Sequence, residues 1–192
     1  MKKIFLLTIT AIILSASQSM AKGPSNPSEP DSVYVGVFFP RTTIEGDIKG
    51  VDYGEGVGGR LGFSTGNVVA SEFSAFKSRH DAGPGERDTF SGITLDIKIS
   101  LPMFPVVAPY GFLGLGRYAL VTPHTVYRGN TAGYGINGYQ RGFGLDLFLS
   151  QMISLNLGYT ERRMRFDTGP AGKDTSRSTA ASYDMGLAFH FY

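Results

Sequence analysis

Residues 183–192, YDMGLAFHFY, decide the fold of this chain. Successive side chains of a β-strand point to opposite faces. On one face, this segment would carry the large side chains of Tyr183, Met185, Leu187, Phe189 and Phe191. On the other face, it would carry Asp184, Gly186, Ala188 and His190. Such a strand suits either a soluble core or a barrel that turns its apolar face to lipid.

The same alternation is clearest in three further segments, residues 89–101, 138–149 and 153–166. A strand with lipid on one side and polar groups on the other has this period of two. The residues expected to face outward are Ile93, Leu95, Ile97, Ile99, Leu101, Phe143, Leu145, Leu147, Leu149, Ile153, Leu155, Leu157 and Tyr159. Residues 32–40 and 107–121 also have strand composition, but their phase stays open.

The N-terminus has the pattern of an export signal. Lys2 and Lys3 precede an apolar run, residues 4–14, and Ser19-Met20-Ala21 offers small residues at the positions that a signal peptidase recognises. We therefore predict a cleaved signal peptide over residues 1–21. The alternative, an N-terminal membrane anchor, would need about 20 apolar residues to span the bilayer, and this run is shorter. No Cys follows, which excludes a lipoprotein anchor.

The composition excludes several kinds of site. The chain has no Cys, which rules out disulfides, metal–thiolate sites and a thiol nucleophile. His80, His124 and His190 are not at metal-ligand spacing, so no metal or cofactor is expected. Removing residues 1–21 takes two of the 18 basic residues and none of the 16 acidic ones, which leaves 16 of each. A neutral chain gives no reason to expect a nucleic-acid partner.

The mature chain divides into a short leader and one domain. Residues 22–31, KGPSNPSEPD, are rich in Pro and Ser, so we expect a flexible periplasmic leader. In residues 32–192, Gly and Pro divide the hydrophobic residues into strand-length pieces, which predicts an outer-membrane β-barrel domain. The eight expected strands are residues 32–40, 53–63, 68–79, 89–101, 107–121, 138–149, 153–166 and 179–192.

The connections between these segments alternate in length. The long ones, which are polar or rich in Gly, are residues 41–52, 80–88, 122–137 and 167–178. The short ones are residues 64–67, 102–106 and 150–152. Long surface loops, short periplasmic turns and an even strand number are typical of outer-membrane barrels. The sequence therefore predicts an all-β fold, an eight-stranded antiparallel up-and-down transmembrane β-barrel. A soluble β-sandwich is the alternative, which solubility of residues 22–192 without detergent would favour.

If the apolar phase faces lipid, seven charged residues face inward. They are Arg60, Glu72, Asp96, Lys98, Asp146, Arg162 and Asp184. Charges inside a narrow barrel must be paired or hydrated, and an eight-stranded barrel is only just wide enough for its own side chains. We therefore expect an interior charge network that plugs the barrel. An ion path through the same charges is the alternative.

Five basic residues fall on the lipid-facing phase near the loop ends of the strands. They are Lys77, Arg79, Arg141, Arg163 and Arg165. A charge at the membrane centre costs about 2–4 kcal/mol, and this cost falls to about 0–1 kcal/mol near the interface. These residues must therefore lie at the rim. They are either ordinary interfacial charges or contacts to lipopolysaccharide phosphates, with which Arg makes bidentate bonds.

Similarity to a known family rests on residues 33–37 (VYVGV), residues 109–116 (PYGFLGLG) and the aromatic closing strand. With these segments, residues 32–192 resemble the small eight-stranded barrels typified by the membrane domain of outer membrane protein A. The resemblance implies a non-enzymatic protein that the barrel-assembly machinery recognises through its C-terminal strand. Two departures stand out. Tyr192 follows the last lipid-facing aromatic residue, Phe191. We also expect no peptidoglycan-binding domain after the barrel, so the cell-wall tethering of longer relatives is not expected here.

The expected function is an envelope-integrity or surface-interaction role in the bacterial outer membrane, among outer-membrane lipid and lipopolysaccharide. A narrow ion or small-solute channel is the second hypothesis. A lipid A-modifying enzyme is the third, in which Ser78, His80 and Asp81 would form a hydrolase-like group at the outer rim. The longest loop, residues 122–137, either binds an unknown surface ligand or only covers the barrel mouth.

Overall fold

The computed structural model describes residues 32–47, 53–65, 68–83, 86–101, 103, 106–122, 126–128, 136–167 and 175–192. The predicted signal peptide and leader, residues 1–31, lie outside the described residues, as do parts of the four long connections. Within the described residues, no helix is long and apolar enough to cross a membrane.

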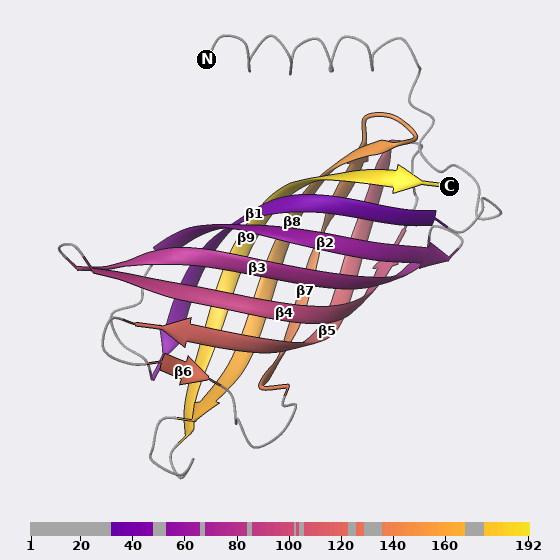
Figure 1. Ribbon diagram of the computed structural model, residues 1–192. Helices are drawn as coiled ribbons and strands as arrows, with labels where there is room; N and C mark the ends of the chain where they lie inside the picture. Colours follow the sequence, from indigo (N-terminus) through magenta and orange to yellow (C-terminus); the bar gives the residue numbers. More distant parts are fainter. Residues whose placement is uncertain are drawn as a thin grey trace, which may run out of the picture.

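The secondary-structure elements of the described residues are all strands, and they form one closed sheet (Figure 1). They are β1 (Ser32–Gly46), β2 (Tyr53–Thr65), β3 (Val69–Gly83), β4 (Glu86–Ser100), β5 (Val107–Val121), β6 (Val126–Arg128), β7 (Gly138–Phe148), β8 (Ile153–Asp167) and β9 (Thr175–Phe191). Of these, β6 has three residues, and the others have 11 to 17. Each long strand pairs antiparallel with its neighbours, and β9 pairs with β1, which closes the barrel. The predicted eight-stranded up-and-down barrel is confirmed.

The strands reach further toward the long connections than predicted. We call this end of the barrel the outer end, and the end with the short turns the inner end. The predicted strand 32–40 stops at Pro40, but β1 continues to Gly46. Because Pro lacks an N–H, the β1–β2 ladder skips Phe39 and Pro40 and resumes at Arg41 in the same register. The short strand β6 lies within the connection 122–137, where no strand was predicted.

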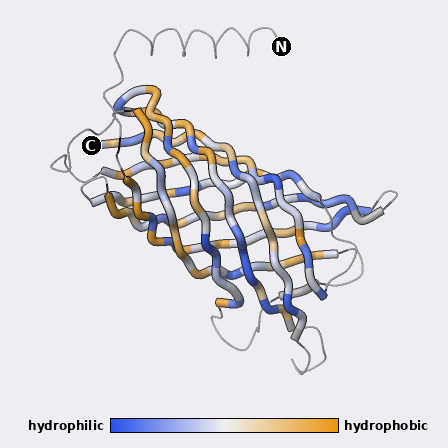
Figure 2. The backbone as a smooth tube through the Cα atoms, turned by 180° about the vertical axis from the view of Figure 1, so that it is seen from behind, coloured by the Kyte–Doolittle hydropathy of each residue, from blue (hydrophilic) through white to orange (hydrophobic). Residues whose placement is uncertain are grey.

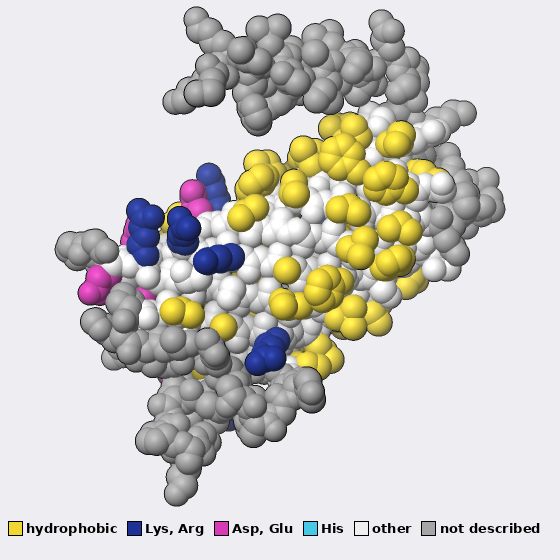
Figure 3. Space-filling view, viewed as in Figure 1, with side chains coloured by type: hydrophobic (Ala, Val, Ile, Leu, Met, Phe, Trp, Pro, Cys, Tyr) yellow, Lys and Arg dark blue, Asp and Glu magenta, His cyan; other side chains and the backbone are white. Residues whose placement is uncertain are grey.

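An apolar belt surrounds the half of the barrel nearest the inner end, and Lys and Arg side chains lie beyond it (Figures 2 and 3). In β9, every second side chain from Tyr183 to Phe191 is exposed, and this length is close to the ~9–11 residues that a membrane-spanning strand needs. At the outer margin of the belt, the ring centroids of Phe143 and Tyr159 lie 5.6 Å apart, and those of Tyr159 and Tyr183 lie 5.4 Å apart. This row matches an aromatic girdle at the membrane interface.

Beyond the belt, the two faces of the barrel wall exchange character. In β8, Leu157 faces outward within the belt, whereas Arg163 and Arg165 face outward beyond it. The inward side chains that alternate with them are those of Met164 and Phe166, which are buried. The outer part of the wall therefore resembles an ordinary soluble barrel, with a polar exterior and an apolar interior.

Candidate functional site

The innermost part of the polar interior is built around a buried ion pair. Lys98 Nζ on β4 lies 2.7 Å from Asp146 Oδ2 on β7. The ammonium also lies 4.0 Å from the ring centroid of Tyr110, so a cation–π contact adds to the pair. Asn156 on β8 donates to Asp146 Oδ1 at 2.6 Å. Two strands, β4 and β8, thus supply partners to the Asp146 carboxylate.

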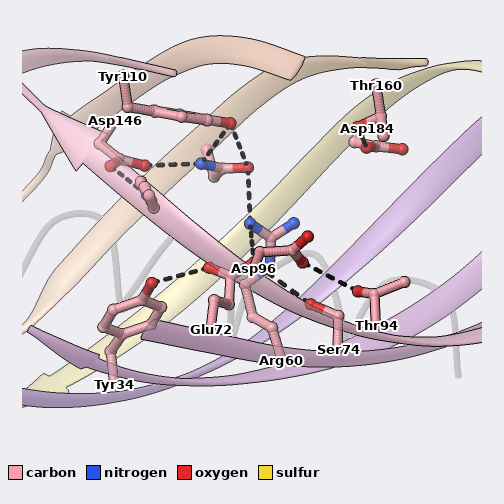
Figure 4. Close-up of polar contacts among 12 residues, drawn as sticks. Tyr34, Arg60, Glu72, Ser74, Thr94, Asp96, Tyr110, Asp146, Thr160 and Asp184 are labelled. Carbon is pink, nitrogen blue, oxygen red and sulfur yellow. Dashed lines mark hydrogen bonds and ion pairs between the residues drawn. The ribbon is translucent and has the colours of Figure 1, made fainter. Parts of the chain in front are cut away.

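A second ion pair joins the adjacent strands β2 and β3 (Figure 4). Arg60 on β2 lies 3.6 Å from Glu72 on β3, and the phenol of Tyr34 donates to the same carboxylate at 2.8 Å. Arg60 also donates to Asn156 Oδ1 at 3.2 Å, which joins this pair to the first one. Its guanidinium lies 4.5 Å from the ring centroid of Phe38, at the border of the apolar interior.

The third pair, Arg162 on β8 and Asp184 on β9, is the loosest at 4.0 Å. Arg162 is held more closely by Gln140, because the Nε of Arg162 donates to the Oε1 of Gln140 at 3.1 Å. Gln140 in turn donates to Asp96 at 2.6 Å, and Thr94 donates to the same carboxylate at 2.9 Å. Asp96 is therefore held by neutral donors, with no salt bridge among the described residues. All seven charges expected inside lie inside, in two hydrogen-bonded groups, one around Asp146 and Glu72 and one around Arg162.

Little free space remains around these two groups. One void lined by Arg60, Asp96 and Arg162 measures about 30 Å³. Two others beside Lys98 and Asp146 measure about 30 and 10 Å³. Each is the size of one or two water molecules, so the side chains of the described residues fill this part of the barrel.

A second, apolar layer fills the outer half of the interior, and the sequence-based prediction of a polar interior missed it. We call this layer the plug; its members are Phe38, Ile44, Phe76, Phe90, Tyr118, Leu120, Met164, Phe166 and Ala180. Phe90 is fully buried, stacks on Tyr118 with centroids 6.0 Å apart, and meets Phe76 edge-on at 5.3 Å. Arg162 caps the layer with its guanidinium 4.5 Å from the Phe76 ring centroid. The signal for the plug was available in ERRMRF, residues 161–166, where the alternation changes phase.

The serine and histidine of the suggested hydrolase-like group do lie together, but with a different acid. Ser78 Oγ lies 2.9 Å from His80 Nε2 inside β3. Asp81 faces outward, so the suggested pairing with His80 is wrong, and Asp88 on β4 is the cross-strand neighbour of His80. Burial raises the pKa of Asp88, which lies beyond the apolar belt, and His80 partly offsets the rise. Ser78 is fully buried, so its hydroxyl is closed to a substrate in this conformation.

The five basic residues expected at the rim all face outward beyond the apolar belt. Arg141 on β7 and Arg163 on β8 flank Glu161 and contact its carboxylate at 2.9 and 2.7 Å. These bonds hold the pKa of Glu161 below its ordinary value. The exposed residues Lys77, Arg79 and Arg165 have no salt bridge among the described residues.

The outer wall carries further cations that the sequence-based analysis did not select. Together with the five expected ones they form a collar, whose members are Arg41, Lys77, Arg79, Arg87, Arg117, Arg141, Arg163, Arg165 and Arg177. Arg165 and Arg177 are direct cross-strand neighbours on β8 and β9. Like charges in this position repel one another. The strand register, which brings these two together, was not available from the sequence.

Comparisons with known proteins agree with this geometry. The family model of the outer membrane protein beta-barrel domain matches residues 6–191. Neisserial surface protein A is similar in structure, with a TM-score of 0.62 and 14% identity over 85% of this chain and 100% of its own. Ail of Yersinia pestis gives a TM-score of 0.55 and 12% identity over 85% and 100% of the two chains. OprG of Pseudomonas aeruginosa gives a TM-score of 0.53 and 15% identity over 90% of this chain and 98% of its own.

No curated protein matches the sequence. These three structures are 12–15% identical to this chain, so they establish the fold alone. The family match extends over nearly the whole sequence, including every strand of the barrel. This chain therefore belongs to the outer membrane protein beta-barrel domain family.

Proposed function

We propose that this protein is a non-enzymatic, non-conducting barrel of the outer membrane that acts in envelope integrity or in interactions at the cell surface. The observation that carries the proposal is the filled interior. Two hydrogen-bonded groups with three ion pairs occupy its inner half, and an apolar plug occupies its outer half. A structure closed in this way leaves the outer wall and the loops as the surfaces that act on other molecules.

The proposal includes export through the cleaved signal peptide, residues 1–21, and membrane insertion through the C-terminal strand by the barrel-assembly machinery. Phe189 and Phe191 on β9 are exposed on the lipid face, which suits such recognition. In the membrane the collar lies at the level of the outer-leaflet headgroups, where lipopolysaccharide carries phosphate. Contact between the collar and these phosphates is part of the proposed role.

Deletion of the protein in its native host separates this role from a channel. Loss of an envelope component sensitises cells to large hydrophobic antibiotics and leaves the uptake of small hydrophilic solutes unchanged. Loss of a channel reduces the uptake of small hydrophilic solutes and does not sensitise cells to large hydrophobic antibiotics. We expect the first result, and reduced solute uptake without sensitisation would overturn the proposal.

The same strain tests the enzyme hypothesis. We expect identical lipid A mass spectra with and without the protein. We also expect Ser78→Ala to complement the deletion as well as the wild type, because a fully buried hydroxyl with no route to substrate is not needed for this role. A lipid A mass change that depends on Ser78 would establish the enzyme instead.

A further inference from the structure

The lipid-facing wall carries a groove between β4 and β8, with a volume of about 980 Å³. One side is formed by Ile97 and Ile99 on β4 and by Leu101 just after that strand. The other side is formed by Phe143 on β7 and Tyr159 on β8. The lining is almost entirely apolar within the membrane belt. The groove's apolar lining and its place on the lipid-facing belt suit a hydrocarbon chain.

A glycine creates this groove. Gly111 faces outward on β5, between Ile99 on β4 and Phe143 on β7. A Cβ atom at Gly111 would meet a single heavy atom, the carbonyl oxygen of Gly142, at 3.8 Å. The barrel therefore does not require glycine here for its own packing. What the missing side chain provides is space on the lipid side.

The outer end of the groove is charged. Arg141 and Glu161 line it, and Glu161 bridges Arg141 to Arg163. Beyond this triad, Arg165 and Arg177 face one another across β8 and β9 with no salt bridge among the described residues. Four arginines outnumber the two carboxylates beside them, Glu161 and Asp47, whose Oδ2 accepts from the backbone N–H of Arg177 at 2.8 Å. The site is therefore cationic, and it lies beyond the charged end of the apolar groove. An anionic headgroup at the arginines would relieve the repulsion within the Arg165–Arg177 pair.

We propose that this groove and the four arginines bind one molecule of the phosphorylated, multiply acylated glycolipid of the outer leaflet, lipid A. One acyl chain lies along the groove over Gly111, and a phosphate lies against Arg165 and Arg177. The inference rests on the proposed function because it requires the collar to lie at the outer-leaflet headgroups. It goes further in naming one face of the barrel as a specific lipid site.

The test uses the mature protein purified from outer membranes and native mass spectrometry to count bound lipid A. Gly111→Leu fills the groove. The matched control is Gly59→Leu on β2, another outward glycine, whose added Cβ would also meet one carbonyl oxygen at 3.8 Å. We expect the wild type and Gly59→Leu to retain one lipid A. For Gly111→Leu we expect at least about tenfold lower occupancy, which corresponds to about 1.4 kcal/mol of lost binding.

The headgroup half of the site is tested with added bisphosphorylated and dephosphorylated lipid A. Arg165→Gln with Arg177→Gln should weaken binding of the phosphorylated form and leave the dephosphorylated form unchanged. The control is Lys77→Gln with Arg79→Gln, on the opposite side of the collar. Equal lipid retention by Gly111→Leu and Gly59→Leu would overturn the site, as would equal binding of phosphatidylglycerol and lipid A. These assays use purified protein, so they fail or succeed independently of the deletion phenotype.

Discussion

Charged residues are stable inside this barrel because partners from several strands surround each of them. Lys98 has a carboxylate at 2.7 Å and an aromatic ring beneath it. Asp96 has two neutral donors in place of a cation. Because removing water from a charge is costly, such partners decide whether a buried charge is tolerated at all.

Lys98→Met tests this dependence. The substitution should lower the free energy of unfolding by about 3–5 kcal/mol, because it leaves Asp146 buried without its cation. Adding Asp146→Leu should restore most of the loss, since apolar residues replace a buried ion pair at little cost. Urea-induced unfolding in phospholipid vesicles measures the free energy of unfolding of the single and the double variant.

A matched control is Arg41→Gln. Arg41 and Glu55 form an ion pair at 3.5 Å, but their side chains are 68% and 64% exposed. An exposed pair contributes at most about 1 kcal/mol. If Lys98→Met costs no more than Arg41→Gln, the interior pair does not stabilise the barrel as described.

At the scale of the strand, the exchange of faces beyond the belt is the main feature that the sequence-based analysis did not use. The prediction followed one rule, apolar outward and polar inward, and it located the strands of the belt. The predicted strand 153–166 already includes Arg163 and Arg165, and β8 ends one residue later, at Asp167, but the rule did not anticipate apolar inward residues such as Phe166. The reason is physical, because outside the hydrocarbon the exterior no longer has to be apolar, and the interior still has to be filled.

Nitroxide labels on β8 measure this exchange directly. The chain has no Cys, so single substitutions give unique labels. In vesicles, a label at Leu157→Cys should collide with oxygen dissolved in lipid, and a label at Arg163→Cys with a water-soluble nickel chelate. A label at Met164→Cys should be protected from both. If the label at position 163 collided with oxygen in lipid instead of with the nickel chelate, the membrane boundary would lie elsewhere.

At the scale of the whole molecule, the plug contributes stability as well as closure. Phe90→Ala should lower the free energy of unfolding by about 3–5 kcal/mol, because it leaves a cavity among packed rings. Phe73→Ala is the control, since Phe73 is 48% exposed on the lipid face and lipid chains can fill the space it leaves. Similar losses for the two variants would contradict the plug as a packed core.

Much of this architecture follows from the sequence. The strand count, the barrel and the inward direction of Arg60 or Asp184 all depend on local periodicity. The pairs Lys98–Asp146 and Arg165–Arg177 depend on which strands are neighbours and in what register, which no local pattern specifies. The same is true of Ser78, His80 and Asp88, where the nearest acid in sequence, Asp81, faces the other way.

The central claim is that the barrel is closed by two layers, one polar and one apolar. Single-channel recording of refolded residues 22–192 in a planar bilayer, at two salt concentrations, tests it most directly. We predict no stable conductance steps at either concentration. Stable steps whose ion selectivity changes with Asp96→Asn or Arg162→Gln would show that the interior charges line an open path, and would contradict the account.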